Sequence, residues 1–361
     1  PFKNVYFTGI VRDKLGRKMS KSLGNSPDPI ELIEKYGADG VRMGMLLASP
    51  AGNDLPFDES YCEQGRNFSN KIWNALRLIK SQKVEDIPQS NSSKLAIEWF
   101  RAKINQTLSL LEDDFSKYRL SESLMRVYKF IWDDFCSWYL EIIKPAYQSP
   151  MDKATYEQTL DIFETLMKIL HPFMPFVTEE IYHLIREREE KDFIMLAQMP
   201  EVQPFDEKLL ADFEFVQEFV ACIRAVRNEK NIPQKNTLEA FFAKTAEAEV
   251  VEKYSELITK LCNLQTLALC DQKVEKSVAK MVRTMEVFVP FADNINKEEE
   301  IKKINEEIKY FEGFKASVEK KLANENFVNK APQKVVDTER KKLSDCEQKL
   351  QTLREQLAGL A

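Results

Sequence analysis

A heptad repeat at the C-terminal end leaves the fewest folds open to this chain. Residues at seven-residue steps, with a second set interleaved, form two stretches of roughly four repeats each. Such a repeat holds two helices together along one apolar seam. Because residues 323–332 separate the stretches, they predict a two-stranded antiparallel coiled coil, each strand on the order of 40 Å long at 1.5 Å per residue. The heptad positions are Ile301, Ile304, Ile308, Phe311, Lys315, Val318, Leu322, Val336, Leu343, Cys346, Leu350, Leu353, Leu357 and Leu360.

The middle of the chain, residues 58–204, consists of amphipathic helical patterns joined by short connections. Phe68, Ile72 and Leu76 recur at helical spacing, and polar residues cover the opposite side. Short connections between such helices predict an antiparallel bundle. Aromatic side chains at this spacing, Trp73 among them, are expected in the core, and His171 is expected as a capping or core residue. Further helices are predicted over 94–114, 121–147, 153–170 and 178–188, with a break at Pro172 and Pro175.

Two smaller segments flank the bundle. Residues 1–57 predict a strand over 3–12, a turn over 13–17, a polar loop, and helices from the cap Asp28 to Tyr36 and from 38 to 48. Residues 205–293 predict a small α/β unit without site chemistry, with helices over 206–230 and 246–261 and strands near 238–242, 266–269 and 285–290. Because the chain has only ten glycines and 30% charged residues, we expect a mostly α fold divided into 1–57, 58–204, 205–293 and 294–361.

Composition limits the cellular environment and the classes of partner that we expect for the chain. Six scattered cysteines and only two histidines favour reduced thiols in the cytoplasm and argue against a disulfide framework or a metal site. No apolar run approaches bilayer length, so no membrane association is expected. The net charge of −6 does not exclude a nucleic-acid partner, because basic residues can gather on one surface. The chain begins at Pro1 inside a strand-like run, so we expect a piece of a longer protein. We also expect it to be a monomer.

The loop Gly16–Asn25 carries the most distinctive chemistry. It holds Lys18, Ser20, Lys21 and Ser22 between two glycines. Glycines allow tight folding, and two ammonium groups three residues apart can close over a polyphosphate and neutralise charge that develops during phosphoryl or adenylyl chemistry. A solvated hairpin tip without function would have a similar composition. The loop therefore predicts a nucleotide site only together with its neighbours.

Those neighbours carry a resemblance to a known family. Residues 18–25 read Lys-Met-Ser-Lys-Ser-Leu-Gly-Asn, which resembles the KMSKS signature of class I aminoacyl-tRNA synthetases, and residues 28–42 resemble the segment that follows it. Residues 70–77 and 170–181 resemble strings of the anticodon-binding domain of the same enzymes, and 223–230 resemble the junction that follows that domain. Residues 321–332 resemble the tip of the C-terminal coiled coil of the valine-specific members, an arm that the isoleucine and leucine enzymes lack.

The resemblance implies an activity for the whole enzyme. It would activate valine with ATP, accompanied by Mg²⁺, and transfer valine to the 3′ end of valine tRNA. Lys21 would contact ATP and stabilise charge as pyrophosphate leaves, Lys18 would assist, and Ser20 and Ser22 would shape the loop. The 361 residues alone are expected to bind tRNA but not to catalyse or edit, because the partner HIGH signature and its nucleotide-binding sheet are missing. The remainder of the synthetase chain would act in cis.

Candidate tRNA contacts follow from what RNA offers a protein. An anticodon presents splayed bases, which suit amides, arginines and aromatic rings, and phosphates attract lysines and arginines. Two other classes stay open: a sibling ligase for isoleucine or leucine, and a non-catalytic tRNA-binding or coiled-coil module. The candidates are Arg66, Asn70, Lys71, Asn74 and Arg77 on the bundle, and Lys320, Lys321, Lys330, Lys334, Arg340, Lys341 and Lys342 near the hairpin tip.

Overall fold

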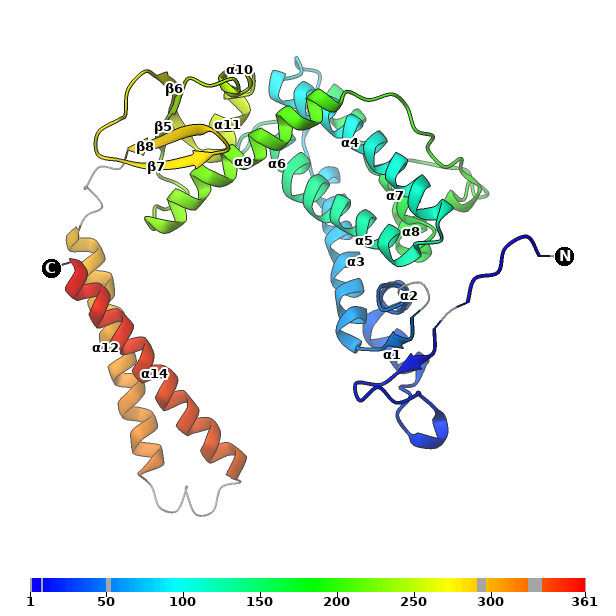
Figure 1. Cartoon of the computed structure of the whole chain (residues 1–361), viewed down its shortest axis with the longest axis horizontal. Coiled ribbons are helices and arrows are strands. Elements are labelled where there is room, and N and C mark those ends of the chain that lie inside the picture. Colours follow the sequence, from blue (N-terminus) through cyan, green and yellow to red (C-terminus); the bar gives the residue numbers. More distant parts are fainter. Residues whose placement is uncertain (1, 8, 50–52, 291–296, 324–332, 361) are drawn as a thin grey trace. The chain divides into compact units, whose positions relative to one another are not determined.

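The computed structural model describes residues 2–7, 9–49, 53–290, 297–323 and 333–360 (Figure 1). The chain divides into two compact units, one made of residues 1–272 with 280–287 and the other of 273–279 with 288–361. Helices make up most of both units, so the expectation of a mostly α fold is confirmed.

The first elements form a small layer around an apolar cluster. Strand β1 (Val11–Arg12) pairs in parallel with β2 (Leu55–Pro56), and between them lie the 3-10 turn η1 (Lys21–Leu23) and helices α1 (Pro29–Tyr36) and α2 (Ala38–Leu47). The predicted start of α1 is confirmed, because Asp28 Oδ1 accepts from the amide of Ile30 at 2.7 Å. Leu32, Leu55 and Phe57 are buried in the cluster, together with Tyr36, Ala48 and Cys62.

The predicted strand over 3–12 is wrong for most of its length. Only Val11 and Arg12 are strand, and the side chains of Phe2, Val5 and Phe7 are exposed. A strand needs a neighbour for its backbone N–H and C=O groups, and in the described part of the chain β2 offers just two residues of pairing. The carbonyl of Ile10 still accepts from the amide of Leu55 at 2.9 Å, but the described residues before Ile10 have no strand partner there.

The bundle runs from the light-blue helix α3 through the cyan and green helices α4 to α8 in Figure 1. Most predicted helices are present with ends shifted by a few residues, and helix α7 has the predicted bounds. Two-residue strands β3 (Val84–Glu85) and β4 (Met151–Asp152) pair in parallel beside it. The helices are α3 (Glu59–Lys80), α4 (Asn91–Ser116), α5 (Leu120–Lys129), α6 (Leu140–Ile143), α7 (Lys153–Leu170) and α8 (Pro175–Ile185), and the 3-10 turn η3 (Ile194–Leu196) follows them.

The helix predicted over 121–147 differs from the structure in two ways. Its middle is a π-helix, η2 (Phe130–Tyr139), which joins α5 to α6 without a break. It ends at Ile143, because Lys144 precedes Pro145 and the residue before a proline is driven out of the helical region. The wider turns of η2 present aromatic residues to the bundle interior.

Stacked and tilted aromatic rings fill the core, as predicted. The ring of Phe100 lies 5.1 Å from that of Phe130, and Phe135 lies 5.4 Å from Phe163, measured between centroids. All four side chains are buried. The prediction for Trp73 is wrong, because 37% of this residue is exposed on the outer side of α3. His171 caps the end of α7, and its Nδ1 lies 2.7 Å from the hydroxyl of Thr178.

A small sheet follows the bundle. Its four strands lie in the order β6-β5-β8-β7, with β5 and β6 parallel. Arg227 of helix α9 is buried, and its guanidinium donates to the carbonyl oxygens of Pro233, Asn236 and Cys262 at 2.8–2.9 Å. Strand β7, whose residues are mostly exposed or half-buried, was not predicted. The elements are α9 (Glu207–Glu229), β5 (Leu238–Ala243), α10 (Ala248–Lys253), α11 (Ser255–Cys262), β6 (Leu264–Cys270), β7 (Ser277–Val282) and β8 (Met285–Pro290).

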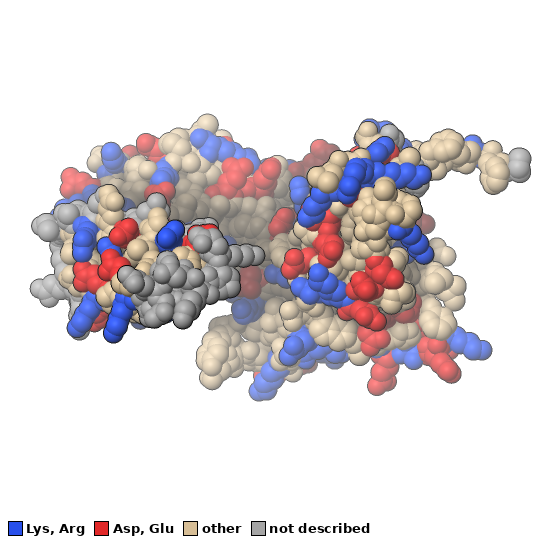
Figure 2. Space-filling view, turned by 90° about the horizontal axis from the view of Figure 1, so that it is seen from below, with Lys and Arg blue, Asp and Glu red and all other residues tan. Residues whose placement is uncertain are grey.

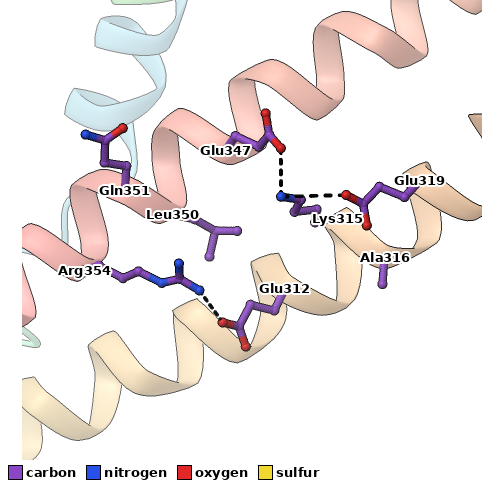
Figure 3. A pocket seen from close by; sticks show the side chains of 8 residues that line it. All are labelled: Glu312, Lys315, Ala316, Glu319, Glu347, Leu350, Gln351 and Arg354. Carbon is purple, nitrogen blue, oxygen red and sulfur yellow. Dashed lines mark hydrogen bonds and ion pairs between the residues drawn. The ribbon is translucent and has the colours of Figure 1, made fainter.

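The last helices, α12 (Lys297–Leu322) and α14 (Gln333–Leu360), form a hairpin (Figure 1). Among its heptad residues Val318, Val336, Cys346, Leu350 and Leu353 are buried. Figure 3 shows two ion pairs that cross between the helices, Lys315 with Glu347 and Arg354 with Glu312, each at 2.8 Å. Lys315 occupies a half-buried heptad position, and its ion pair with Glu347 on the opposite helix stabilises the lysine there.

Helices α2 and α3 cross with their backbones in contact. A Cβ placed on Gly65 would lie 2.6 Å from the carbonyl oxygen of Gly40 and 2.8 Å from its Cα. One turn further along α2, a Cβ on Gly44 would lie 2.7 Å from the amide nitrogen and Sγ of Cys62. Only residues without a side chain permit this approach. The crossing therefore fixes α2, which follows the polar loop, against α3, which begins the bundle.

Substituting Gly65 with Ala should destabilise the unit that contains it. The new methyl group would meet backbone atoms that cannot rotate away, and overpacking of this kind costs about 1–3 kcal/mol. Gly313→Ala on α12 is the matched control, since a Cβ there meets nothing within 4 Å and should stabilise the helix by about 0.5–1 kcal/mol. Calorimetric unfolding of both variants tests this. Equal effects of the two substitutions would contradict the crossing geometry.

Candidate functional site

The polar loop is anchored to β1 by main-chain hydrogen bonds. The amide of Met19 donates to the carbonyl of Val11 at 3.0 Å, and the amide of Asp13 donates to the carbonyl of Arg17 at 2.9 Å. Gly16, with φ of 75°, closes the turn between these bonds in a conformation that favours glycine. The turn predicted over 13–17 is therefore confirmed, and it holds residues 18–20 beside β1.

Asp13 organises the turn. Its Oδ1 accepts from the amides of Leu15 and Arg17 at 3.0 and 2.9 Å, and its Oδ2 accepts from Arg17 Nε at 2.8 Å and from Asn25 Nδ2 at 3.0 Å. The hydrogen bonds from the Asn25 and Arg17 side chains hold the pKa of this carboxyl well below its usual range. Asp13 and Asn25 were not among the predicted site residues.

The second half of the signature forms a single 3-10 turn. The Ser20 hydroxyl accepts from the amide of Leu23 at 3.3 Å and lies 3.2 Å from the hydroxyl of Ser22. Gly24, with φ of 63°, ends the turn and donates to the carbonyl of Lys21. Of the predicted serines, Ser20 thus shapes the loop, and Ser22 contacts it side chain to side chain.

Both predicted lysines of the loop are exposed. Neither Lys18 nor Lys21 makes an ion pair with another residue that the structure describes, whereas the neighbouring Lys14 pairs with Asp58 at 3.1 Å. Two ammonium groups on one ordered loop, with no carboxylate among the described residues to neutralise them, suit a polyanion. The arrangement can therefore bind and stabilise developing negative charge on phosphate oxygens.

Helix α2 connects this loop to the bundle through polar contacts as well as through glycines. Asp39 is buried at the N-terminus of α8, where its carboxylate accepts from the amides of Val177 at 2.7 Å and Phe176 at 3.3 Å. Arg42 donates from Nε to the carbonyl of Phe173 at 3.2 Å. Burial raises the pKa of Asp39, and the two amides and the Arg42 charge act in the opposite direction.

The predicted tRNA contacts on α3 fall into two groups. Asn70, Asn74 and Arg77 are exposed, and their side chains make no hydrogen bond or ion pair with a residue that the structure describes. Arg66 is half-buried, with Nη2 3.5 Å from Glu63 and its guanidinium 5.7 Å from the ring of Tyr36, and Lys71 lies 5.3 Å from the ring of Trp132.

Trp73 lies on the same face as the exposed group. Positions 73 and 74 each lie three or four residues from both 70 and 77, so all four positions are grouped on one side of the helix. The exposed α3 face, defined here as Asn70, Trp73, Asn74 and Arg77, thus joins an aromatic ring to two amides and a guanidinium. The sequence signal for Trp73 was present, since position 73 falls on the polar side of the helix, but its size favoured a core placement.

The predicted contacts on the hairpin are only partly described. Lys321 and Lys342 approach the carboxylate of Glu339 at 3.8 and 2.7 Å, while Lys320 and Arg340 are exposed without an ion pair to a described residue. Lys330 and the side chains of Lys334 and Lys341 lie outside the described part. Figure 2 shows Lys and Arg interspersed with Asp and Glu on the viewed face, so charge there is mixed.

Metal, disulfide and membrane-spanning features do not add to this site. In the ranges that the structure describes, no group of three or more His, Cys, Asp or Glu side chains is placed to hold a metal ion. The six cysteines are free. Among the described helices, none is both long and apolar enough to span a membrane.

Comparison with protein families gives three matches in order along the chain. Residues 1–58 match "tRNA synthetases class I (I, L, M and V)", residues 98–242 match "Anticodon-binding domain of tRNA ligase", and residues 296–361 match "Valyl tRNA synthetase tRNA binding arm". The match to the last family covers both helices of the hairpin.

Curated relatives match over the whole length. Valine–tRNA ligases of Parabacteroides distasonis and Phocaeicola vulgatus are each 55% identical over 100% of this chain, which spans 41% of their length. That of Fusobacterium nucleatum is 38% identical over 99% of the chain. Among solved structures, an Agrobacterium radiobacter LeuRS–tRNA complex is a weak match, with 15% identity and a TM-score of 0.40 over 76% of this chain and 30% of that one.

Replacing Asp39 with Asn should change how stability depends on pH. Because burial raises the folded-state pKa above the unfolded value of ~3.9, the folded chain binds more protons between those two values. The native chain therefore loses stability as pH rises from the unfolded pKa through the folded pKa. The introduced carboxamide keeps an oxygen for the amide of Val177 but cannot ionise. The free energy of unfolding of the variant should therefore rise relative to that of the native chain as pH rises. Urea unfolding at several acidic and neutral pH values measures this.

Asp39→Ala is the control, since it removes the acceptor as well as the charge. It should destabilise at every pH by about 0.5–2 kcal/mol, the cost of a lost helix cap. A stability difference between the Asp39→Asn variant and the native chain that stays constant with pH would contradict the assignment.

Proposed function

The chain belongs to the valyl-tRNA synthetases, of which it spans about 41% of the length, and we propose that it supplies the tRNA-recognition part and the signature loop of a valine–tRNA ligase. The observation that carries the proposal is the similarity to such ligases at 50–55% identity along the whole chain, together with family matches that end in the valine-type arm. The parent enzyme would activate valine with ATP and transfer it to valine tRNA.

In the proposed first reaction the loop lysines act on ATP. Lys21 would bind phosphate oxygens and stabilise the charge that builds as pyrophosphate leaves, with Lys18 assisting. The exposed state of both ammonium groups, without an ion pair to a described residue, supports this role. A loop that engages ATP fully only as the reaction proceeds lowers the barrier more effectively than one that binds substrate tightly from the start. In the full-length enzyme Mg²⁺ would accompany ATP as its counter-ion.

The exposed α3 face would meet the anticodon. Trp73 can stack on a base, the amides of Asn70 and Asn74 can bond base edges, and Arg77 can hold a phosphate. Arg66 and Lys71 are engaged with neighbouring rings and would add positive charge beside this face. The combination of aromatic ring and amides on one exposed face supports reading of bases rather than phosphate contact alone.

The hairpin would serve as a coiled-coil arm against the outer part of tRNA. Lys320 and Arg340 are exposed near the end of α12 and the start of α14, where they can contact phosphates, and Lys321, Lys330, Lys334, Lys341 and Lys342 complete the proposed set. Lysines and arginines on phosphates give salt-dependent, sequence-independent affinity.

The proposed division of labour follows the four segments. Residues 1–57 would form the C-terminal edge of the catalytic domain, and residues 58–204 would bind the anticodon. Residues 205–293 would serve as the junction, and residues 294–361 would form the arm. The protein would act as a monomer in the cytoplasm, with the rest of the synthetase in cis. An isoleucine or leucine ligase would lack the arm match at 296–361. If the chain were instead a non-catalytic module, it would bind tRNA, and Lys21 would have no role in ATP chemistry.

Lys21→Ala in the full-length ligase should slow valine-dependent pyrophosphate exchange by about 10²- to 10³-fold, because a preorganised group that stabilises transition-state charge is lost. Affinity for valine tRNA should be nearly unchanged. Lys14→Ala in the preceding turn is the control, since Lys14 already pairs with Asp58. An unchanged exchange rate in the Lys21 variant would rule out the proposed role.

Trp73→Ala in the 361-residue chain should weaken its binding to valine tRNA roughly 5- to 150-fold. This range corresponds to about 1–3 kcal/mol for a lost base stack. The loss should persist at higher salt and should be smaller for a tRNA with a substituted anticodon. Tyr147→Ala, an exposed aromatic outside the α3 face, is the control. Equal binding of both tRNAs by the native chain, collapsing with salt, would show phosphate contact only.

A further inference from the structure

We propose that Asn25 is a positioning residue for the loop lysines, because its carboxamide takes the place of the C=O and N–H of a residue in a neighbouring β-strand beside Met19. The proposal rests on the function proposed above for Lys18 and Lys21. Asn25 itself would touch neither ATP nor valine. Its effect on the reaction would come from the direction in which it holds the two ammonium groups.

The Asn25 side chain bonds both peptides that flank Met19. Its Oδ1 accepts from the amide of Ser20 at 2.9 Å, and its Nδ2 donates to the carbonyl of Lys18 at 3.2 Å. In an extended segment the carbonyl of one residue and the amide two residues later point to the same side. In a carboxamide the oxygen and one of the two N–H donors point to the same side, so one side chain satisfies both groups as the C=O and N–H of a residue in a neighbouring strand would, and the second N–H stays available.

The opposite edge of the same segment is bonded to a real strand. The amide of Met19 donates to the carbonyl of Val11 in β1, and Lys18 forms an antiparallel bridge with Arg12. Residues 18–20 are therefore held on both edges, by β1 on one side and by a single side chain on the other. Alternate side chains then point to opposite faces. Met19 packs on the apolar cluster, and Lys18 is exposed.

Asp13 fixes which way the Asn25 amide points. A carboxylate only accepts hydrogen bonds, so the group 3.0 Å from Asp13 Oδ2 must be the NH₂ of Asn25. The amide oxygen is thereby left facing Ser20. Arg17, which bonds the same carboxylate, holds Asp13 in place. The turn before the lysines and the residue after them are thus joined by one Asp–Asn hydrogen bond.

The consequence for the lysines is preorganisation. Ser20, held by Asn25, also caps the 3-10 turn that carries Lys21, so one carboxamide orients the segment of Lys18 and the turn of Lys21 together. Catalytic groups that are held in position avoid reorganisation during the reaction, and a displacement of about 1 Å can reduce a rate by about 10²-fold.

Asn25→Asp in the full-length ligase tests the proposal. The substitution keeps the shape but places an acceptor against the Lys18 carbonyl and against the Asp13 carboxylate. The rate constant for valyl-adenylate formation should fall about 10- to 100-fold, with the KM for valine and the affinity for valine tRNA unchanged. Asn91→Asp, the same change at an exposed position in the first turn of α4, should leave the rate as it is.

The double variant Asp13→Asn with Asn25→Asp is the more specific test. It restores a donor–acceptor pair between positions 13 and 25 with the polarity reversed, while an acceptor still faces the Lys18 carbonyl, so it should recover the part of the lost rate that depends on the bond between positions 13 and 25. Hydrogen exchange of the loop amides should be faster in Asn25→Asp and slower again in the double variant. These results together would support the proposal.

Three results would overturn it: a native rate in Asn25→Asp, a double variant no faster than the single one, or a parallel loss of tRNA affinity, which would indicate general misfolding. Lys21→Ala, measured beside these variants, separates the two proposals. If Lys21→Ala is slow and Asn25→Asp is not, only the role of Asn25 fails. If Lys21→Ala retains the native rate, the function proposed for the loop fails first.

Discussion

Helices α2 and α3 meet backbone to backbone at Gly40 and Gly65, and the rest of the first unit depends on that contact. Side chains normally separate packed helices by about 8–10 Å, but here the absence of Cβ atoms removes the spacer. Asp39, one residue before Gly40, caps α8, so the same short segment is tied to the beginning and the end of the bundle. Loop and bundle thereby share a single rigid element, and the exposed α3 face is carried on the helix that the glycines hold.

The signature loop solves a different physical problem, which is to stay ordered while its charged side chains remain available. Its bonds join backbone groups to one another and to the short polar side chains of Asp13, Ser20 and Asn25, and Arg17 and Asn25 add side-chain bonds to Asp13. The side chains of Lys18 and Lys21 take no part in the described network. A loop stabilised by its own lysines would have to break those contacts before binding a phosphate, whereas this one keeps its stabilising bonds when the lysines engage.

Sequence reasoning was most successful where a local cause decides the outcome. Asp28 and Pro29 start α1, the heptad spacing places Val318 and Leu350 inside the hairpin, and the family resemblance is matched by relatives along the whole chain. It failed where the outcome depends on distant groups. The described strand-like residues before Ile10 find no strand partner among the described residues, and the position of Trp73 on α3 exposes it although aromatic residues usually lie in the core. Asn25 was interpreted only as part of a signature, since hydrogen bonds across five and twelve residues are invisible without coordinates.

The π-helical stretch η2 has a consequence for how this bundle can change over evolutionary time. In its wide turns residues five apart share a face, as the Ser137 hydroxyl bonded to the carbonyl of Trp132 illustrates, and Phe130, Phe135 and Leu140 are all buried. Because a π-helical turn holds more residues than an α-helical turn, a return of this stretch to α-helical geometry at unchanged length would rotate everything after it. Ile142 and Ile143 would then leave their buried positions. Lineages carrying this helix can exchange its side chains one at a time, but they cannot return it to α-helical turns at the same length without rebuilding the bundle.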